Sequence, residues 1–113
     1  MHEVGLMESA LEIVFDNAKH QNATRIHKVG MKVGALSGVV PDALEFAFEA
    51  LVRNTIAADA VLEIELIPVT CYCPNCNSEF EPGEFSYECP QCGKPTGELR
   101  QGQELQLTHI EVS

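Results

Sequence analysis

The chain contains no tryptophan, and only 6% of its 113 residues are aromatic. A core with so few large rings is aliphatic and marginal, so a structural metal would help to stabilise it. No apolar run approaches the roughly 20 residues that a membrane-spanning helix needs. The N-terminal segment also lacks the basic and apolar regions of a signal peptide. We therefore expect a cytoplasmic protein that does not enter a membrane.

Basic residues are scarce, since 7 Lys and Arg stand against 17 Asp and Glu and give a formal net charge of −10. Nucleic acids and anionic lipid surfaces repel a protein with such an excess of negative charge. The balance argues against nucleic acid and membranes as partners. It favours a basic protein or a metal cation.

Hydrophobic periodicity predicts two helices and three strands. Apolar residues recur at three-and-four spacing in residues 4–20 and again from 41 to about 54, as in amphipathic helices. Residues 25–33, 61–69 and 104–112 alternate in the manner of strands. The strand–helix–strand order favours parallel pairing of the first two strands, whereas the last strand could pair in either direction. The predicted fold class is α/β, in the broader α+β sense.

The closing strand contains a break in its alternation. Leu105 and Leu107 share one parity, whereas Ile110 and Val112 share the other. One extra residue would bring all four side chains to the same face. We therefore predict a β-bulge near residues 108–109.

Four of the five cysteines form two matched pairs, Cys73-x2-Cys76 and Cys89-x2-Cys92. A gap of two residues allows both thiolates of a pair to face one ion, and the Pro-Gly turn between the pairs folds one onto the other. The pattern predicts a zinc-binding ribbon over residues 70–97. Iron bound by the same thiolates, a redox pair and disulfides are the alternatives.

The zinc should be structural, because four protein ligands leave no coordination position for water or substrate. Gly93 follows the second pair and would allow the positive φ that such a turn commonly needs. Cys71 lies two residues before Cys73, and we expect it to point away from the metal. Ligation by Cys71 is the alternative.

The first three residues offer a different set of metal donors. The α-amine of Met1, the amide and ring nitrogens of His2 and the amide of Glu3 can close adjacent chelate rings. Four nitrogens in a plane suit Ni(II) or Cu(II) better than Zn(II). Binding should strengthen with pH, because these donors must lose protons.

Further short motifs extend along the whole chain in a fixed order, and the cysteine ribbon falls between the last two. They are Met1-His2-Glu3-Val4, Leu6-Met7-Glu8, Val33-Gly34, Ser37-Gly38, Phe46-Ala47-Phe48, Leu62-Glu63-Ile64 and Ile110-Glu111-Val112. With them the chain resembles the HypA/HybF family of hydrogenase nickel-incorporation proteins. The N-terminal tripeptide combined with a CxxC–CxxC ribbon is highly specific, although neither part is specific alone.

The resemblance implies a three-stranded mixed sheet with two helices, plus a small zinc-ribbon lobe. A nickel-binding α/β domain would comprise residues 1–69 and 98–113. The zinc-binding ribbon of residues 70–97 would be inserted before the last strand, with structural Zn(II) held by the four paired cysteines.

The resemblance also implies a nickel metallochaperone that helps to insert Ni(II), its transient cargo, into the NiFe-hydrogenase large subunit during maturation. A hydrogenase maturation GTPase would be the second partner. His2 would be the essential nickel ligand, with Met1 and Glu3 contributing main-chain nitrogens. Some relatives carry a histidine just after a cysteine pair, but Asn77 and Gly93 stand at those positions here. Monomer and homodimer both stay open.

Other functions fit part of these observations. A zinc-ribbon module for nucleic-acid or protein interaction without a nickel role is one alternative, and a rubredoxin-like electron carrier is another. We find no nucleophile–base pair, phosphate-binding loop or convergent carboxylates, so we do not expect an enzyme. His20, His27 and His109 are expected to have surface or packing roles.

Overall fold

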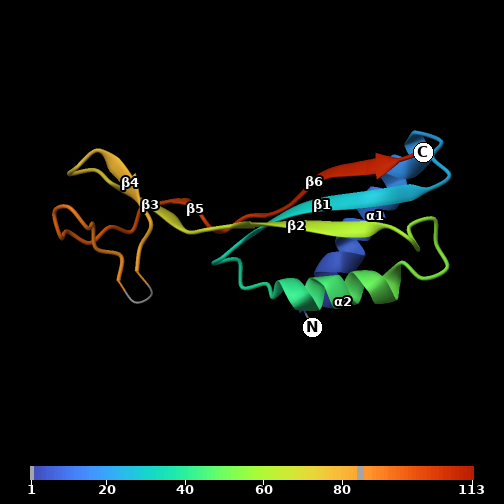
Figure 1. Cartoon of the computed structure of the whole chain (residues 1–113), viewed down its shortest axis with the longest axis horizontal. Coiled ribbons are helices and arrows are strands. Elements are labelled where there is room, and N and C mark those ends of the chain that lie inside the picture. Colours follow the sequence, from blue (N-terminus) through green and yellow to red (C-terminus); the bar gives the residue numbers. More distant parts are fainter. Residues whose placement is uncertain (1, 84–85) are drawn as a thin grey trace.

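The computed structural model describes residues 2–83 and 86–113, which form two lobes joined by a narrow neck (Figure 1). The molecule is elongated, with extents of 55 × 27 × 17 Å. The two helices are α1 (His2–His20) and α2 (Pro41–Leu51), and neither is long and apolar enough to cross a membrane. The strands are β1 (Ile26–Gly34), β2 (Val61–Ile67), β3 (Thr70–Cys73), β4 (Ser78–Phe80), β5 (Leu99–Gln101) and β6 (Leu105–Val112).

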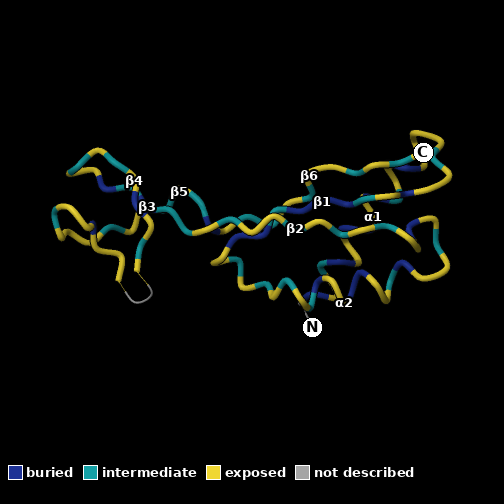
Figure 2. Tube along the Cα trace, viewed as in Figure 1, coloured by how far each residue is buried: buried dark blue, intermediate teal, exposed yellow. Residues whose placement is uncertain are grey.

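The larger lobe is built on a mixed sheet with the strand order β2-β1-β6. β1 pairs in parallel with β2 and antiparallel with β6. The core lies between this sheet and the two helices, and Figure 2 shows that buried positions concentrate along β1. The largest fully buried side chains of this lobe are Met7, Val14, Ile26, Val29, Val33 and Leu44. The predicted fold and the parallel pairing of the first two strands are confirmed.

The opposite face of the sheet carries charged and polar side chains. Lys28 Nζ lies 3.5 Å from Glu63 Oε2 on β2 and 3.6 Å from Glu111 Oε2 on β6. The charges of Glu111 and Glu63 raise the pKa of Lys28. The ring of His109 lies over Gly30, where an added Cβ would be 2.2 Å from ring carbon Cε1. Pairs between neighbouring strands therefore balance much of the charge on this face.

The predicted bulge lies at Thr108. Gly30 pairs with His109 and the next residue, Met31, pairs with Leu107, so Thr108 is one residue too many on β6. Apolar side chains on both sides of the bulge then pack against the same core. The sequence prediction is confirmed.

Two helix ends differ from the residues that the hydrophobic periodicity predicts. α1 begins at His2 rather than at residue 4, and α2 ends at Leu51 rather than near Asn54. Asn54 has φ of 62°, a left-handed conformation that stops a helix and that asparagine tolerates. The apolar stripe continues past the end of α2 because Val52 is also buried, which explains the overestimate.

The smaller lobe contains a second sheet with the order β4-β3-β5. Along the chain, β2 leads into β3 and β5 leads into β6, so this lobe is inserted between the two strands that flank β1. β5 places residues 99–101 in the second sheet, just beyond residue 97. The division into domains at residues 70 and 97 stays a prediction.

Backbone contacts around Gly34 hold the neck between the lobes. The Gly34 N–H donates to the Glu104 carbonyl at 2.7 Å, and the Leu36 N–H donates to the Gly102 carbonyl at 2.7 Å. A Cβ added to Gly34 would lie 2.2 Å from the Gly102 oxygen. The neck therefore requires a residue without a side chain at position 34.

Gly34→Ala should lower the free energy of unfolding by about 1–3 kcal/mol, because its Cβ would overlap the backbone of Gly102. The matched control is Gly5→Ala on α1, where an added Cβ meets no heavy atom within 4 Å. That change should raise the free energy of unfolding by about 0.5–1 kcal/mol through helix propensity. Denaturant unfolding followed by circular dichroism measures both, and an undiminished stability of Gly34→Ala would contradict this account of the neck.

Candidate metal centres

The four paired cysteines of the ribbon converge on one point. Their sulfurs all lie within 4.8 Å of one another, and the four residues are Cys73, Cys76, Cys89 and Cys92. The sulfurs of Cys73 and Cys92 are 3.6 Å apart, and those of Cys76 and Cys89 are 3.8 Å apart. A disulfide would require about 2.0 Å, so these are free thiols. The structure thus brings together the four residues that the sequence singled out.

The sulfur positions fit a tetrahedral zinc ion. Four Zn–S bonds of about 2.3 Å in a regular tetrahedron set the sulfurs about 3.8 Å apart. The separations of 3.6 and 3.8 Å in these two pairs agree with this value. Four thiolates would complete the coordination sphere, so the zinc is a structural cofactor with no open position.

Two tight turns shape this cluster. The residue after each pair has a positive φ, 57° at Asn77 and 75° at Gly93, and both residue types adopt this conformation readily. The Gly93 N–H donates to the Cys89 carbonyl at 2.8 Å and closes the second turn. The positive φ predicted at Gly93 is confirmed, and the first turn repeats it with asparagine.

The thiols of the cluster differ in acidity. Hydrogen bonding to Cys92, reinforced by burial, raises the pKa of Cys76 to about 12. A backbone hydrogen bond at Lys94 lowers the pKa of Cys92 to about 6. The coupled thiols therefore still share a proton at neutral pH, and an arriving metal ion must displace it. Zinc affinity consequently rises with pH.

Cys71 is not one of the converging thiols. It lies fully buried on β3, opposite Phe80 on β4 and Leu99 on β5. Burial raises the pKa of its thiol, which keeps it protonated and unreactive. Cys71 acts as a small apolar residue in the core of the ribbon.

Two of the three residues predicted to bind nickel, His2 and Glu3, begin α1. Met1 and the side chain of His2 lie outside the described residues, whereas the main chain of His2 begins the helix. Glu3 is only 7% exposed. Its Oε2 accepts a hydrogen bond of 3.1 Å from the Val40 N–H. This bond ties the first turn of α1 to the start of α2.

Sequence reasoning missed this role of the Glu3 carboxylate. Val40 occupies the N-cap of α2, makes no side-chain cap bond and precedes Pro41. Ser, Thr, Asp or Asn commonly fills this position, so an apolar N-cap indicates that the helix start is supported from elsewhere. The apolar N-cap can be seen in the sequence, but it does not identify Glu3 as the residue that contacts Val40.

The other histidines are not part of the cysteine cluster. Each ring has a nitrogen within 3.0 Å of a polar neighbour: His20 with the Asp16 carbonyl, His27 with Ser113 Oγ, and His109 with Thr108 Oγ1. Among the described side chains, the four cysteines are the one group of three or more potential metal ligands. These contacts agree with the expected surface and packing roles.

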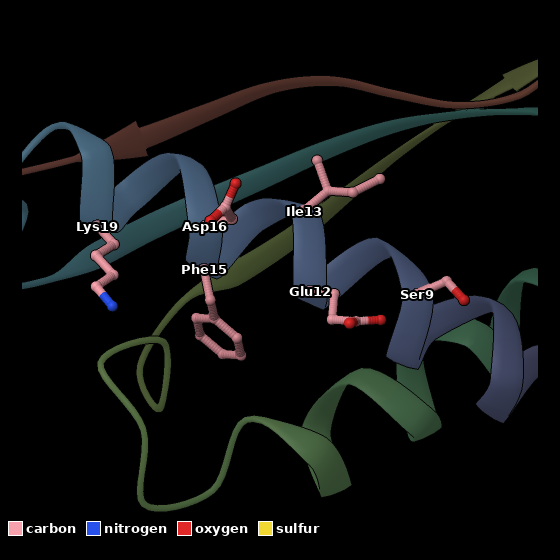
Figure 3. A pocket seen from close by; sticks show the side chains of 6 residues that line it. All are labelled: Ser9, Glu12, Ile13, Phe15, Asp16 and Lys19. Carbon is pink, nitrogen blue, oxygen red and sulfur yellow. The ribbon is translucent and has the colours of Figure 1, made fainter.

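One hollow lies along α1, and none of the four clustered cysteines lines it (Figure 3). Its volume is about 720 Å³, and it is lined by Ser9, Glu12, Ile13, Phe15, Asp16 and Lys19. All six belong to one helix, so the hollow is an open surface depression. Substrate pockets are enclosed on several sides, and this one is not.

The whole chain matches a family model described as hydrogenase/urease nickel incorporation, metallochaperone, hypA, over residues 1–112. This chain belongs to the HypA family. It is 46% identical over 112 residues to the hydrogenase maturation factor HypA of Picosynechococcus, with 99% of both chains covered. The HypA of Rhizobium leguminosarum is 41% identical over 112 residues, also with 99% of both covered.

Solved structures share the fold. The solution structure of the Ni metallochaperone HypA from Helicobacter pylori has a TM-score of 0.66 at 27% identity, covering 99% of this chain and 97% of that one. A second solution structure of a HypA protein has a TM-score of 0.73 at 27% identity, covering 100% and 97%. The predicted resemblance to this family is therefore confirmed.

Family membership decides among the functions that the sequence left open. The chain is a nickel metallochaperone of hydrogenase maturation, with nickel as cargo, structural zinc in the ribbon and hydrogenase-related partners. Its family role is the incorporation of nickel during hydrogenase maturation.

Removal of zinc by a chelator should unfold β3, β4 and β5 but leave the larger lobe folded, because the two lobes have separate core clusters. Cys76→Ser should likewise lose the bound zinc. Cys71→Ala is the matched control and should keep one zinc per chain, since Cys71 stands outside the cluster. Metal analysis and amide NMR spectra test this, and zinc loss in Cys71→Ala would show that the ligand set is different.

Glu3→Ala should lower the free energy of unfolding by about 1–3 kcal/mol, because it removes the acceptor for the Val40 N–H. Glu3→Gln keeps an acceptor oxygen and should cost less. Amide hydrogen exchange at Val40 reports on this bond directly and should accelerate in Glu3→Ala far more than in Glu3→Gln. Equal exchange rates in the two variants would contradict the proposed anchor.

Proposed function

We propose that this chain binds Ni(II) at its first three residues and transfers it to the NiFe-hydrogenase large subunit together with a maturation GTPase. The observation that carries the proposal is the family match over residues 1–112, which includes the tripeptide. The donors would be the Met1 amine, the amide and imidazole nitrogens of His2 and the amide of Glu3. Such a nitrogen set suits Ni(II).

The start of α1 explains why this site would hold nickel only moderately. The first N–H groups of an α-helix have no acceptor within the helix, so the helical ladder does not compete with the metal for these nitrogens. The positive end of the helix dipole opposes a bound cation. Loss of amide protons on binding and the nearby carboxylate of Glu3 offset that repulsion. The net result is a cargo that can leave.

Nickel transfer would then be a ligand exchange. The ion would leave the few donors at the chain end and bind a more enclosed site on the hydrogenase large subunit. Residues 1–69 and 98–113 would form the nickel-binding domain and residues 70–97 the zinc-binding ribbon. Free thiols persist in a reducing compartment, which supports a cytoplasmic location. No observation favours the nucleic-acid alternative, and the charge of −10 opposes it.

His2→Ala should abolish stoichiometric Ni(II) binding, because it removes the imidazole donor from the chelate. His27→Ala is the matched control, since His27 is exposed on β1 and hydrogen-bonded to Ser113. Titration calorimetry on untagged protein with a free Met1 amine measures both, with zinc content as the check on folding. Unchanged nickel affinity in His2→Ala, or its loss in His27→Ala, would eliminate the proposed site.

A further inference from the structure

The two turns that carry the zinc ligands are near copies, but they differ at one position. The residue after Cys76 is Asn77 and the residue after Cys92 is Gly93, and both have a positive φ. Glycine adopts this left-handed conformation without a steric cost, whereas a residue with a side chain, asparagine included, is less stable in it. The first turn therefore needs a support that the second turn does not.

The cysteines that precede these two residues are the more accessible ligands. Cys76 and Cys92 are partly exposed, whereas Cys73 and Cys89 are buried. A competing ligand in solution would reach the two exposed sulfurs first. The firmness of the two turns therefore sets how quickly zinc can leave the ribbon.

Tyr72 contacts the first turn through its phenol. The Tyr72 O–H donates a hydrogen bond to Asn77 Oδ1. Tyr72 lies on β3 between Cys71 and Cys73, whose side chains are buried, so its own ring projects from the other, partly exposed face of the strand. The phenol thus joins β3 to the residue that follows Cys76.

Three further contacts hold Tyr72 itself in place. Its N–H donates to the Glu98 carbonyl at 2.9 Å, and its carbonyl accepts a hydrogen bond of 2.8 Å from Thr96 Oγ1. The guanidinium of Arg100 lies over the ring, with its Cζ 4.1 Å from the ring centre. These three residues follow the second cysteine pair, and β5 lies beside β3 in the ribbon (Figure 1). The chain on the far side of the cluster therefore fixes the ring that supports the first turn.

We propose that Tyr72 is a positioning residue of the zinc site and acts through Asn77. Its phenol holds the Asn77 side chain, which stabilises the left-handed turn and keeps the Cys76 sulfur directed at the other three sulfurs. Zinc is thereby retained in the ribbon while the nickel cargo is exchanged. This inference does not depend on where in the chain nickel binds.

Tyr72→Phe should make zinc transfer from the full chain to an excess of a chromophoric chelator about two- to tenfold faster. The substitution removes one hydrogen bond and leaves a ring beneath Arg100. The matched control is Tyr87→Phe, which makes the same change in the other tyrosine, 40% exposed and also in the ribbon, and should leave the rate unchanged. Amide NMR spectra of the zinc-loaded variants check that β3, β4 and β5 stay folded.

A spectroscopic measurement separates positioning of a ligand from a general loss of stability. The ligand-field absorption bands of the cobalt-substituted chain depend on how the four sulfurs are arranged around the metal. These bands should shift in Tyr72→Phe, because the Cys76 sulfur is held less firmly, and should stay unchanged in Tyr87→Phe.

Asn77→Gly tests whether Tyr72 acts through the turn. Glycine adopts a positive φ without support, so this variant should keep the zinc transfer rate within about twofold of the wild type. Tyr72→Phe added to Asn77→Gly should then cause no further acceleration. The effect of the lost phenol would thus depend on the residue at position 77.

Unchanged zinc transfer and an unchanged cobalt spectrum in Tyr72→Phe would overturn the proposal. So would an equal effect of Tyr87→Phe, or the same acceleration by Tyr72→Phe with asparagine and with glycine at position 77. If Tyr72→Phe does not fold, Asn77→Ala tests the contact from its other side. Alanine offers neither the acceptor oxygen nor the tolerance of a positive φ, so an unchanged transfer rate in that variant would also overturn the proposal.

Discussion

The pairing of β1 with a strand on each side positions the rest of the molecule. β2 and β6 flank it, and the ribbon is inserted between those two strands in the chain. Hydrogen bonds around Gly34 then hold the strand ends together at the neck. Because Gly102 approaches Gly34 too closely for a side chain, a backbone contact sets the junction of the lobes. The cysteine cluster is therefore held at one end of the molecule, away from α1 (Figure 1).

The two lobes are stabilised in different ways, although both have small cores. The larger lobe packs two apolar helical stripes against β1, whereas the ribbon has a small cluster of buried residues made largely of cysteines. So small a cluster cannot by itself stabilise a fold, and the metal replaces the missing apolar contacts. The same reasoning explains why zinc must stay while nickel must leave. An ion that holds a lobe together needs a complete ligand set, and a cargo ion needs an incomplete one.

Features set by local chemistry could be predicted from the sequence. The bulge at Thr108 follows from a parity change, and the left-handed turn at Gly93 follows from the cysteine spacing. Features that depend on distant partners could not be predicted. The Glu3 carboxylate reaches Val40 only because α1 and α2 pack together, and no pattern in the first turn announces it. The end of α2 was overestimated because buried Val52 continues the helical stripe beyond the last helical residue.

The acidic charge of the chain does not by itself make a nickel site. On the open face of the sheet, the carboxylates of Glu63 and Glu111 are paired with Lys28, so they are not available to gather cations. Exposed acids elsewhere act through a solvent that screens charge within about 8 Å at physiological ionic strength. Carboxylate oxygens also suit Mg²⁺ and Ca²⁺, so carboxylates alone do not distinguish nickel from these ions. Selection of nickel must therefore come from nitrogen donors at a defined place, which is what the start of α1 would supply. The hydrogen bond from the Val40 N–H to the Glu3 carboxylate holds the first turn of α1 against the start of α2, beside that proposed site.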